Sequence, residues 1–363
     1  VINGILENFS TGLFIENSSD GAHEGLTISS YEEGASYGIQ VVDSSFQEFD
    51  NLSIKSEEMM DYGILIENST HTRIADVVIE WMGSYGVYVD EVSYHTVIAD
   101  SVFSRNDRGL FIAGLFTRVI DSVIEHHSSA GIVIKLGAHH AMLEDIYFDD
   151  NAEGLIISGV SDVGVVNATF HENYNGISLL SSSRVSFRDV LLKESEGDAV
   201  HLVGPSVYDI NFDKLIVENT LLPYFDLVIE GPQVSSVSFR DSIIGRYDLK
   251  YNVFSNGIEE FRWIVSDKGA IHFREPIEGR GSSLNNDLAI SHRTSTINDM
   301  THNGLNKIAD IILFITPFAS SSSAFHIFRD GILCEFPLCF VRSIKDDRIV
   351  FRVPGPGHYS FIF

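Results

Sequence analysis

The chain has 363 residues, with 24 lysines and arginines against 51 aspartates and glutamates, and its formal net charge is -27 at pH 7. So acidic a surface repels phosphates, which excludes nucleic acid as a partner. No apolar run approaches the roughly 18 residues of a membrane-spanning helix, so no membrane span is predicted.

The chain begins in the middle of a repeat, because Ile5-Leu6 aligns with Val102-Phe103, and Val1 is not an initiator methionine. Either a signal peptide was removed or a longer chain was cut. No amphipathic capping helix precedes Gly12, and an uncapped solenoid end invites pairing. We therefore expect this end to contact another polypeptide, such as the C-terminal end of a next subunit.

A glycine followed by an apolar-x-apolar triplet returns every 22 to 27 residues. The clear copies begin at Gly12, Gly38, Gly63, Gly86, Gly109, Gly131, Gly154 and Gly176. Looser copies begin at Ala199, Asp226, Asp248 and Ala270. So short a period indicates a solenoid, because one repeat cannot bury its own apolar face and must stack on its neighbours.

Between the glycines lies a second segment, in which apolar and polar residues alternate with a period of two. It ends on a large apolar residue, such as Ile79 or Phe103. Asp or Asn usually stands three places before that end, as Asp76 and Asp100 do. These segments are predicted strands, and two or three per repeat leave no room for crossover helices. A propeller blade would need a period about twice as long. The spacing of Leu and Asn that defines a leucine-rich repeat is absent. We predict an all-β fold, a right-handed parallel β-helix of about a dozen coils over residues 1–275.

The repeat Gly109-Leu-Phe-Ile-Ala-Gly, followed by Val-Ile-Asp-Ser-Val-Ile-Glu, resembles the parallel β-helix repeat of the pectate-lyase-like superfamily, nearest to its NosD-like and carbohydrate-binding or sugar-hydrolase members. The resemblance covers roughly residues 1–275 and implies the fold. It does not imply one function, because that superfamily contains lyases, hydrolases, epimerases, tailspikes, adhesins and surface proteins.

The residue two places after each glycine is predicted to point outward, because its two neighbours face the core together. Six of nine such residues are bulky and apolar, and stacked exposed apolar residues usually mark an interface. We expect this stripe to contact another molecule, or else to be covered by a loop such as 276–306. Its residues are Phe14, Leu65, Tyr88, Phe111, Val133 and Ile156.

Aligned coils place polar side chains at one turn. The candidate catalytic residues there are Glu125, His126, Asp149, Asp150, His171 and Glu172. His127, Asn151 and Asn173 follow at the next position, and Arg105 and Lys193 flank the patch. Carboxylates and imidazoles so close can exchange protons with a polysaccharide, or bind a divalent cation such as Ca²⁺ through Asp149, Asp150 and Glu172. The alternative is that polar turn residues simply stack, as in any β-helix.

A second set of histidines falls in another turn, where they are either solvated or a transition-metal site. They are His71, His95, His139 and His140.

The enzyme signatures of the resembled superfamily are missing. The polygalacturonase set of Asn-Thr-Asp, Gly-His-Gly and Arg-Ile-Lys is absent, and so are the epimerase Asp-Pro-His-Glu and the pectate-lyase Trp-x-Asp-His. Asp149-Asp150 is the sole adjacent Asp pair of the repeats, and the chain has two tryptophans, Trp81 and Trp263. The sequence thus leans away from an enzyme.

After residue 275 the period is lost. Residues 276–306 are expected to form a linker or irregular cap. Residues 307–363 are expected to form an antiparallel, β-sandwich-like module. Its six strands are predicted at 310–315, 324–328, 332–334, 338–342, 348–353 and 358–363.

Cys334 and Cys339 bracket four residues in a predicted hairpin, either as free thiols or as a disulfide, which we expect. A disulfide implies an extracellular or periplasmic location. Five Asn-x-Ser/Thr sequons are consistent with export, although turns rich in Asn and Ser produce them by chance. They begin at Asn8, Asn17, Asn51, Asn68 and Asn167.

Together these patterns predict a secreted, acidic structural or interaction protein of a cell surface, filament, sheath or virion. It would assemble into a homo-oligomer or polymer through the apolar stripe. The alternatives are a polysaccharide-active enzyme (a lyase, hydrolase or tailspike depolymerase) and a passive glycan-binding module.

Overall fold

The computed structural model has the predicted all-β fold, a solenoid followed by small antiparallel sheets, with about ten turns where the repeat predicted about a dozen. It describes residues 2–31, 34–57, 60–135, 137–231, 234–251, 261–265, 268–273, 277–290, 294–297, 309–314, 326–335, 337–345, 348–354 and 356–362. Within these ranges no helix is long and apolar enough to cross a membrane.

The chain divides into two compact units. The first contains Val1–Val200 and Asn219–Tyr224, and the second contains His201–Glu218 and Phe225–Phe363. The division falls inside the repeats, as it can in a solenoid whose coils contact their immediate neighbours alone. The domain boundaries expected at 275 and 306 stay predictions.

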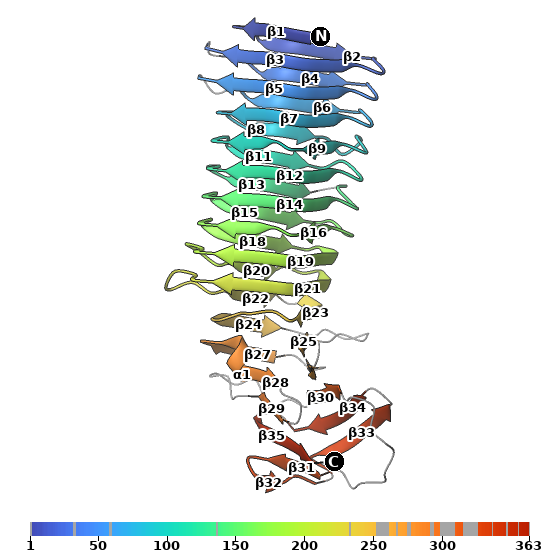
Figure 1. Cartoon of the computed structure of the whole chain (residues 1–363), viewed down its shortest axis with the longest axis vertical. Coiled ribbons are helices and arrows are strands. Elements are labelled where there is room, and N and C mark those ends of the chain that lie inside the picture. The colour runs from blue at the N-terminus through green and yellow to red at the C-terminus, as the bar shows by residue number, and fades with distance from the viewer. Residues whose placement is uncertain are drawn as a thin grey trace. The chain divides into compact units, whose positions relative to one another are not determined.

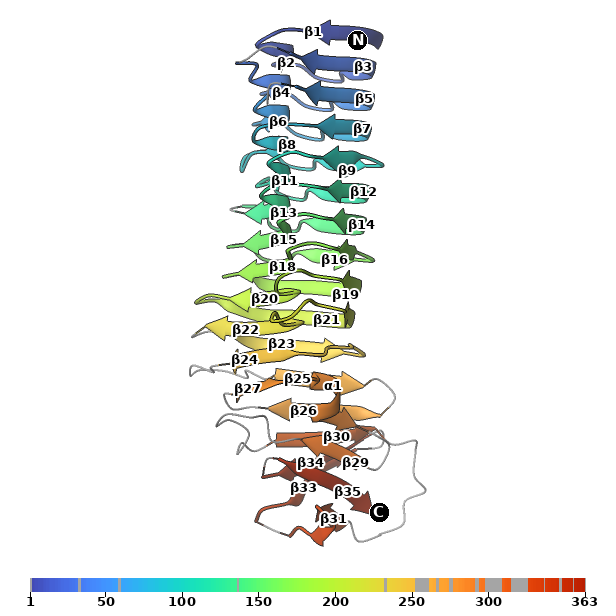
Figure 2. The same cartoon turned by 90° about the vertical axis from the view of Figure 1, so that its left-hand side faces the viewer.

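The first unit consists of two stacks of parallel strands, drawn from blue to green in Figures 1 and 2. One stack contains β1 (Ile2–Glu7), β3 (Ala22–Ser30), β5 (Glu48–Ser56), β7 (Arg73–Glu80), β9 (Val97–Ala99), β10 (Val102–Ser104), β12 (Arg118–Glu125), β14 (Met142–Asp149), β16 (Gly164–Val166), β17 (Thr169–His171) and β19 (Ser183–Lys193). The other contains β2 (Thr11–Glu16), β4 (Tyr37–Val42), β6 (Tyr62–Glu67), β8 (Tyr85–Val89), β11 (Arg108–Ile112), β13 (Ala130–Lys135), β15 (Glu153–Ser158) and β18 (Asn175–Leu180). The core lies between the stacks.

The recurring glycine is explained by the distance between coils. A Cβ on Gly63 would lie 2.6 Å from the carbonyl oxygen of Gly86 and 2.5 Å from Cγ2 of Ile79. A Cβ on Gly154 would lie 2.7 Å from the carbonyl oxygen of Gly176. Both distances are too short for real atoms, so glycine is needed here for close packing rather than for an unusual φ.

The Asp and Asn residues that precede strand ends are explained by a bend. Asp76, Asp100, Asp121 and Asp145 have φ values of 50°, 51°, 47° and 58°. This left-handed region is costly for most residues and least costly for Gly, Asn and Asp. At this position each of these coils therefore bends at a single residue, and the Asp in the sequence marks it.

A buried column of polar side chains supports the next bend. The His127 N–H donates to Oδ1 of Asn151 at 3.0 Å, and the Asn151 N–H donates to Oδ1 of Asn173 at 3.1 Å. The Asn106 N–H in turn donates to Nδ1 of His127 at 3.1 Å. The expectation that His127, Asn151 and Asn173 join the polar turn patch is wrong, because the bend before them directs their side chains inward.

His127 replaces asparagine in this column, and its imidazole is buried. Its Nε2 has no hydrogen-bond partner among the described residues. Burial lowers the pKa of His127 from 6.5 to about 4 because a charged imidazole loses its hydration there.

The second unit begins with parallel strands and then reverses direction. β20 (Val200–Val203) contains the division between the units, and β21 (Val207–Glu218), β22 (Leu227–Gly231), β23 (Val234–Arg240), β24 (Tyr247–Tyr251) and β25 (Phe261–Val265) follow. β24 pairs antiparallel with β27 (Ile277–Gly281), and β25 with β26 (Gly269–Phe273). The loose repeat copy at Ala270 is therefore not a further coil, because its strand runs back along β25.

The C-terminal part contains strands at all six expected places. β30 (Ala309–Phe314), β33 (Phe340–Lys345) and β34 (Arg348–Val353) pair antiparallel. A five-stranded sheet contains β28 (Leu288–Ile290), β29 (Thr294–Ile297), β35 (Gly357–Ile362), β31 (His326–Arg329) and β32 (Ile332–Leu333). Expected strand residues 315, 324–325 and 363 lie outside the described ranges.

Residues 276–306 contribute β27, β28, β29 and the short α1 (Leu284–Asp287), so their described part is more ordered than a linker. A disulfide joins Cys334 and Cys339 after β32, with 5.5 Å between their Cα atoms.

Substituting Gly154→Ala should destabilise the first unit by about 1–3 kcal/mol, because its Cβ would overlap the backbone of the next coil. Gly4→Ala is the control, since its nearest atom is the flexible Leu26 side chain at 3.3 Å. Urea unfolding of both variants measures the difference; equal losses of stability would contradict the packing explanation.

His127 should make stability depend on pH. Its folded pKa lies below its unfolded pKa, so its contribution is fully present above pH 6.5 and is lost as the pH falls toward 4. Acidification from pH 7 to 4 should cost the wild type about 3 kcal/mol more than His127→Asn, in which asparagine completes the column. Urea titrations at the two pH values measure the difference. Equal losses of unfolding free energy in the wild type and in His127→Asn would show that the imidazole stays solvated.

Candidate functional site

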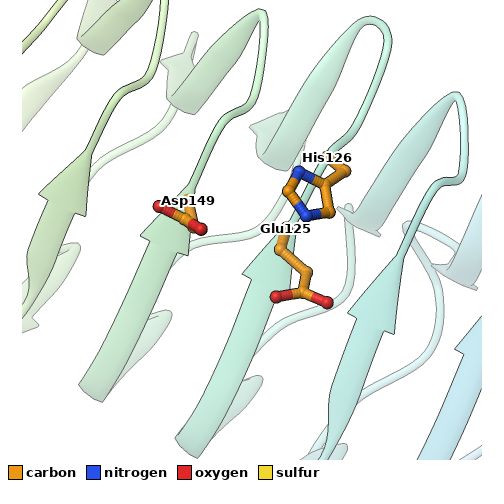
Figure 3. Close-up of side chains that lie close together, drawn as sticks. All are labelled: Glu125, His126 and Asp149. Carbon is orange, nitrogen blue, oxygen red and sulfur yellow. The ribbon is translucent and has the colours of Figure 1, made fainter.

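The six candidate catalytic residues of the sequence lie on one surface of the first unit. Glu125, Asp149 and His171 are the last residues of β12, β14 and β17, and the strand register pairs Glu125 with Asp149 and Asp149 with His171. Figure 3 shows Glu125 and Asp149 extending from the ends of neighbouring strands, with His126 at the bend after Glu125. We call Glu125, His126, Asp149, Asp150, His171 and Glu172 the polar ledge.

Half of the ledge stands on left-handed bends. His126, Asp150 and Glu172 have φ values of 59°, 47° and 51°. For His and Glu this conformation costs about 1–2 kcal/mol per residue. The same bend in earlier coils is occupied by Trp81 (φ 65°) and Arg105 (φ 54°), which the sequence did not mark as strained.

The strongest contact on the ledge joins Asp149 and His171. Nδ1 of His171 lies 2.7 Å from Oδ1 of Asp149, and its Nε2 lies 3.8 Å from Oε1 of Glu172. The hydrogen bond that Asp149 accepts raises the pKa of His171 above its ordinary value, because the carboxylate stabilises the imidazolium. His171 is therefore held in one orientation and keeps its proton to higher pH than a free imidazole.

Three further contacts involve the ledge. Nδ1 of His126 lies 3.0 Å from Oδ2 of Asp150. The Tyr147 hydroxyl donates to Oδ1 of Asp149 at 3.4 Å, and the Tyr147 ring stacks on His171 at 6.4 Å between centroids. Sequence reasoning missed Tyr147, although it stands two places before Asp149 on the same face of the strand.

The ledge offers two groups of metal-ligating atoms. Those of Glu125, His126 and Asp149 lie within 4.8 Å of one another, as do those of His171, Glu172 and Glu194. The predicted set Asp149, Asp150 and Glu172 is thus split, and Asp150 joins neither described group. Glu194 was missed, although it aligns with Glu172 one coil on. Each group offers an imidazole and two carboxylates, a donor set that suits a transition metal better than Ca²⁺ with its six to eight oxygens.

The predicted apolar stripe points outward, but its side chains partly cover one another. Phe14 is 53% exposed, whereas Leu65 and Val133 are 5% and 6% exposed. Tyr88 and Phe111 stack face to face at 4.8 Å, and Ile156 is half-buried. Its role as an interface stays a prediction.

The other turn's histidines lie in a stack of rings. His71 stacks between Phe46 and His95, and Phe116 between His95 and His140, with centroids 4.7–5.0 Å apart. His139 hydrogen-bonds to Ser161 at 3.0 Å. Within the described ranges none of these histidines joins a group of three ligands.

The five sequon asparagines share a backbone conformation, although they lie at different bends of the coil. All are exposed, and all occupy left-handed bends with φ between 42° and 54°. Glycosylation at these positions stays a prediction.

Comparisons with known proteins agree with this architecture. The family described as a right handed beta helix region matches residues 62–219. No curated protein matches the chain. Among solved structures, the enzymatically active domain of tailspike protein 2 of bacteriophage CBA120 has a TM-score of 0.53 at 9% identity, covering 98% of this chain and 64% of that one.

Two other solved structures are similar at lower scores. An alginate lyase from Paenibacillus sp. FPU-7 has 12% identity and a TM-score of 0.43, covering 63% of this chain and 94% of that one. A surface adhesin of Streptococcus pneumoniae has 9% identity and a TM-score of 0.48, covering 80% and 79%. Identities this low report the fold alone. The family match over residues 62–219 and the likeness to the tailspike domain agree that this chain folds as a right-handed parallel β-helix.

Proposed function

We propose that this protein cleaves an extracellular polysaccharide at the polar ledge by acid–base hydrolysis. The observation that carries the proposal is the 2.7 Å contact between Asp149 and His171, which raises the pKa of the imidazole. Protonation of a glycosidic oxygen requires a proton donor, and a raised pKa lets the imidazole keep its proton to higher pH.

Glu125 is the second residue of the proposed reaction. Its carboxylate lies within 4.8 Å of the Asp149 carboxylate, two coils from His171. Two coil steps separate the Glu125 and His171 backbones by about 9.6 Å, which leaves room for a sugar and a water molecule between base and acid. His171 then protonates the leaving oxygen while Glu125 activates the water.

Hydrolysis of a neutral polysaccharide fits the ledge better than elimination from an acidic one. All six ledge residues are carboxylates or histidines that contact a carboxylate, their neighbour Glu194 is a further carboxylate, and the chain carries a net charge of -27. A uronate would be repelled there. Self-assembly, our expectation from the sequence, is less well supported because Leu65 and Val133 of the stripe are largely covered within the chain itself.

The proposal is tested by the release of reducing ends from β-glucan, xylan, mannan and dextran. The wild type should release them from one of these, and His171→Gln should lower kcat by about 10²–10⁴ through loss of the proton donor. His95→Gln, in the ring stack of another turn, is the control and should keep full activity. Undiminished release by His171→Gln would refute the assignment.

The Asp149 contact predicts a shift of the pH profile. Because the charged Asp149 raises the pKa of His171, Asp149→Asn should return that pKa toward its ordinary value. The imidazolium is then lost at lower pH, and the alkaline limb of kcat should move to lower pH. NMR titration of the His171 ring measures the same change without substrate; an unchanged His171 pKa would show that Asp149 does not set it.

A further inference from the structure

We propose that Trp81, together with Arg105, is a binding platform for a sugar ring of the polysaccharide whose cleavage is assigned to the ledge. The platform concerns binding and rests on the proposed function for its substrate class, a neutral hexose or pentose polymer. It lies outside the six ledge residues, in the two coils that precede them.

The platform and the ledge occupy one continuous column of the first unit. The strand ends Glu80, Ser104, Glu125, Asp149 and His171 are paired in register from coil to coil. Backbone N–H groups of the following residues donate to the next strand end, from Trp81 to Ser104 at 3.3 Å and from Arg105 to Glu125 at 3.1 Å. Trp81 and Arg105 therefore stand where His126 and Asp150 stand in later coils.

Trp81 is unusual at this position for two reasons. It holds a left-handed bend, which a bulky aromatic residue rarely adopts. Phe46 and Phe116 hold such bends too, but their rings stack on histidines of neighbouring coils, whereas the contact of Trp81 is with the Arg105 guanidinium. The Trp81 side chain also stabilises the core little, since the residue is 43% exposed. A strained and exposed tryptophan points to a role in binding rather than in folding.

The polar groups around Trp81 suit a sugar. The Arg105 guanidinium lies 5.5 Å from the centre of the indole. Glu80 holds this arginine through a 3.5 Å ion pair and itself accepts a hydrogen bond from Ser104 at 2.9 Å. The guanidinium lies over one face of the indole, so a pyranose would stack its apolar face on the exposed part of the ring while its hydroxyls form hydrogen bonds with Arg105 and Glu80.

The distance between Trp81 and the ledge sets the length of sugar chain that can contact both. Two coil steps, about 10 Å, separate Trp81 from the Glu125 coil, and four steps, about 19 Å, separate it from the His171 coil. A disaccharide bound between Glu125 and His171 cannot reach Trp81, whereas a hexasaccharide can. The platform should thus increase affinity for long chains without changing turnover of short ones.

The indole itself reports binding. The chain has two tryptophans, and Trp263 is 2% exposed, so changes on ligand addition come from Trp81. We would titrate the full chain carrying His171→Gln, which prevents cleavage, with cellohexaose, xylohexaose, mannohexaose and isomaltohexaose, and with the matching disaccharides. A saturable fluorescence change with one hexasaccharide is expected. No change with any of them would overturn the proposal.

The decisive variant is Trp81→Asn, because asparagine suits the left-handed bend. Its melting temperature should equal or exceed that of the parent, while calorimetry should show at least tenfold weaker hexasaccharide binding and unchanged disaccharide binding. Phe116→Ala is the matched control, an aromatic residue equally exposed and also on a left-handed bend, in another turn. Parent-like hexasaccharide affinity in Trp81→Asn would overturn the platform.

The outcomes separate the platform from the hydrolase. Hexasaccharide binding that depends on Trp81, in a chain whose wild type releases no reducing ends, supports the platform and refutes the hydrolase. Reducing ends that depend on His171, with binding indifferent to Trp81→Asn, support the hydrolase and refute the platform.

Discussion

The close stacking of coils is the constraint on which the other features depend. Parallel strands hydrogen-bonded from coil to coil stand about 4.8 Å apart, and any residue in register with another lies directly beside it. Gly63 and Gly154 recur because a Cβ would enter the backbone of the next coil. The same spacing turns isolated polar residues, one per coil, into the polar ledge.

Single-residue bends carry the surface on which we propose that the protein acts. Where the bend residue is Asp76 or Asp121, the left-handed conformation costs little. Where it is Trp81, His126 or Glu172, the cost is larger and the side chain is exposed or partly exposed. Strain of this kind persists where a side chain has a use that folding does not require. The ledge and the platform coincide with one run of such bends, which links the fold to the proposed binding of a long glycan.

The column beneath the ledge ties its geometry to the core. Asn106, His127, Asn151 and Asn173 accept backbone hydrogen bonds inside the turn and so hold the outer residues in place. His127 performs this task with a ring whose Nε2 finds no partner among the described residues, and its lowered pKa records that burial. A single bend therefore separates the neutral side chains of the buried column from the acidic side chains of the ledge.

The repeat alone predicted the β-helix, its register and the polar ledge, because a period of 22–27 residues fixes which side chains stack. The sequence also located all six C-terminal strands. Only the tertiary structure decided that His127 faces the core, that Asp149 holds His171, and that Leu65 and Val133 are covered. It also decided that β25 and β26 reverse direction, which a strand pattern cannot encode because parallel and antiparallel strands share the same alternation. The direction of a side chain at a bend depends on one backbone angle. Where His or Trp stands at a bend in place of Asn, the residue type does not reveal that angle.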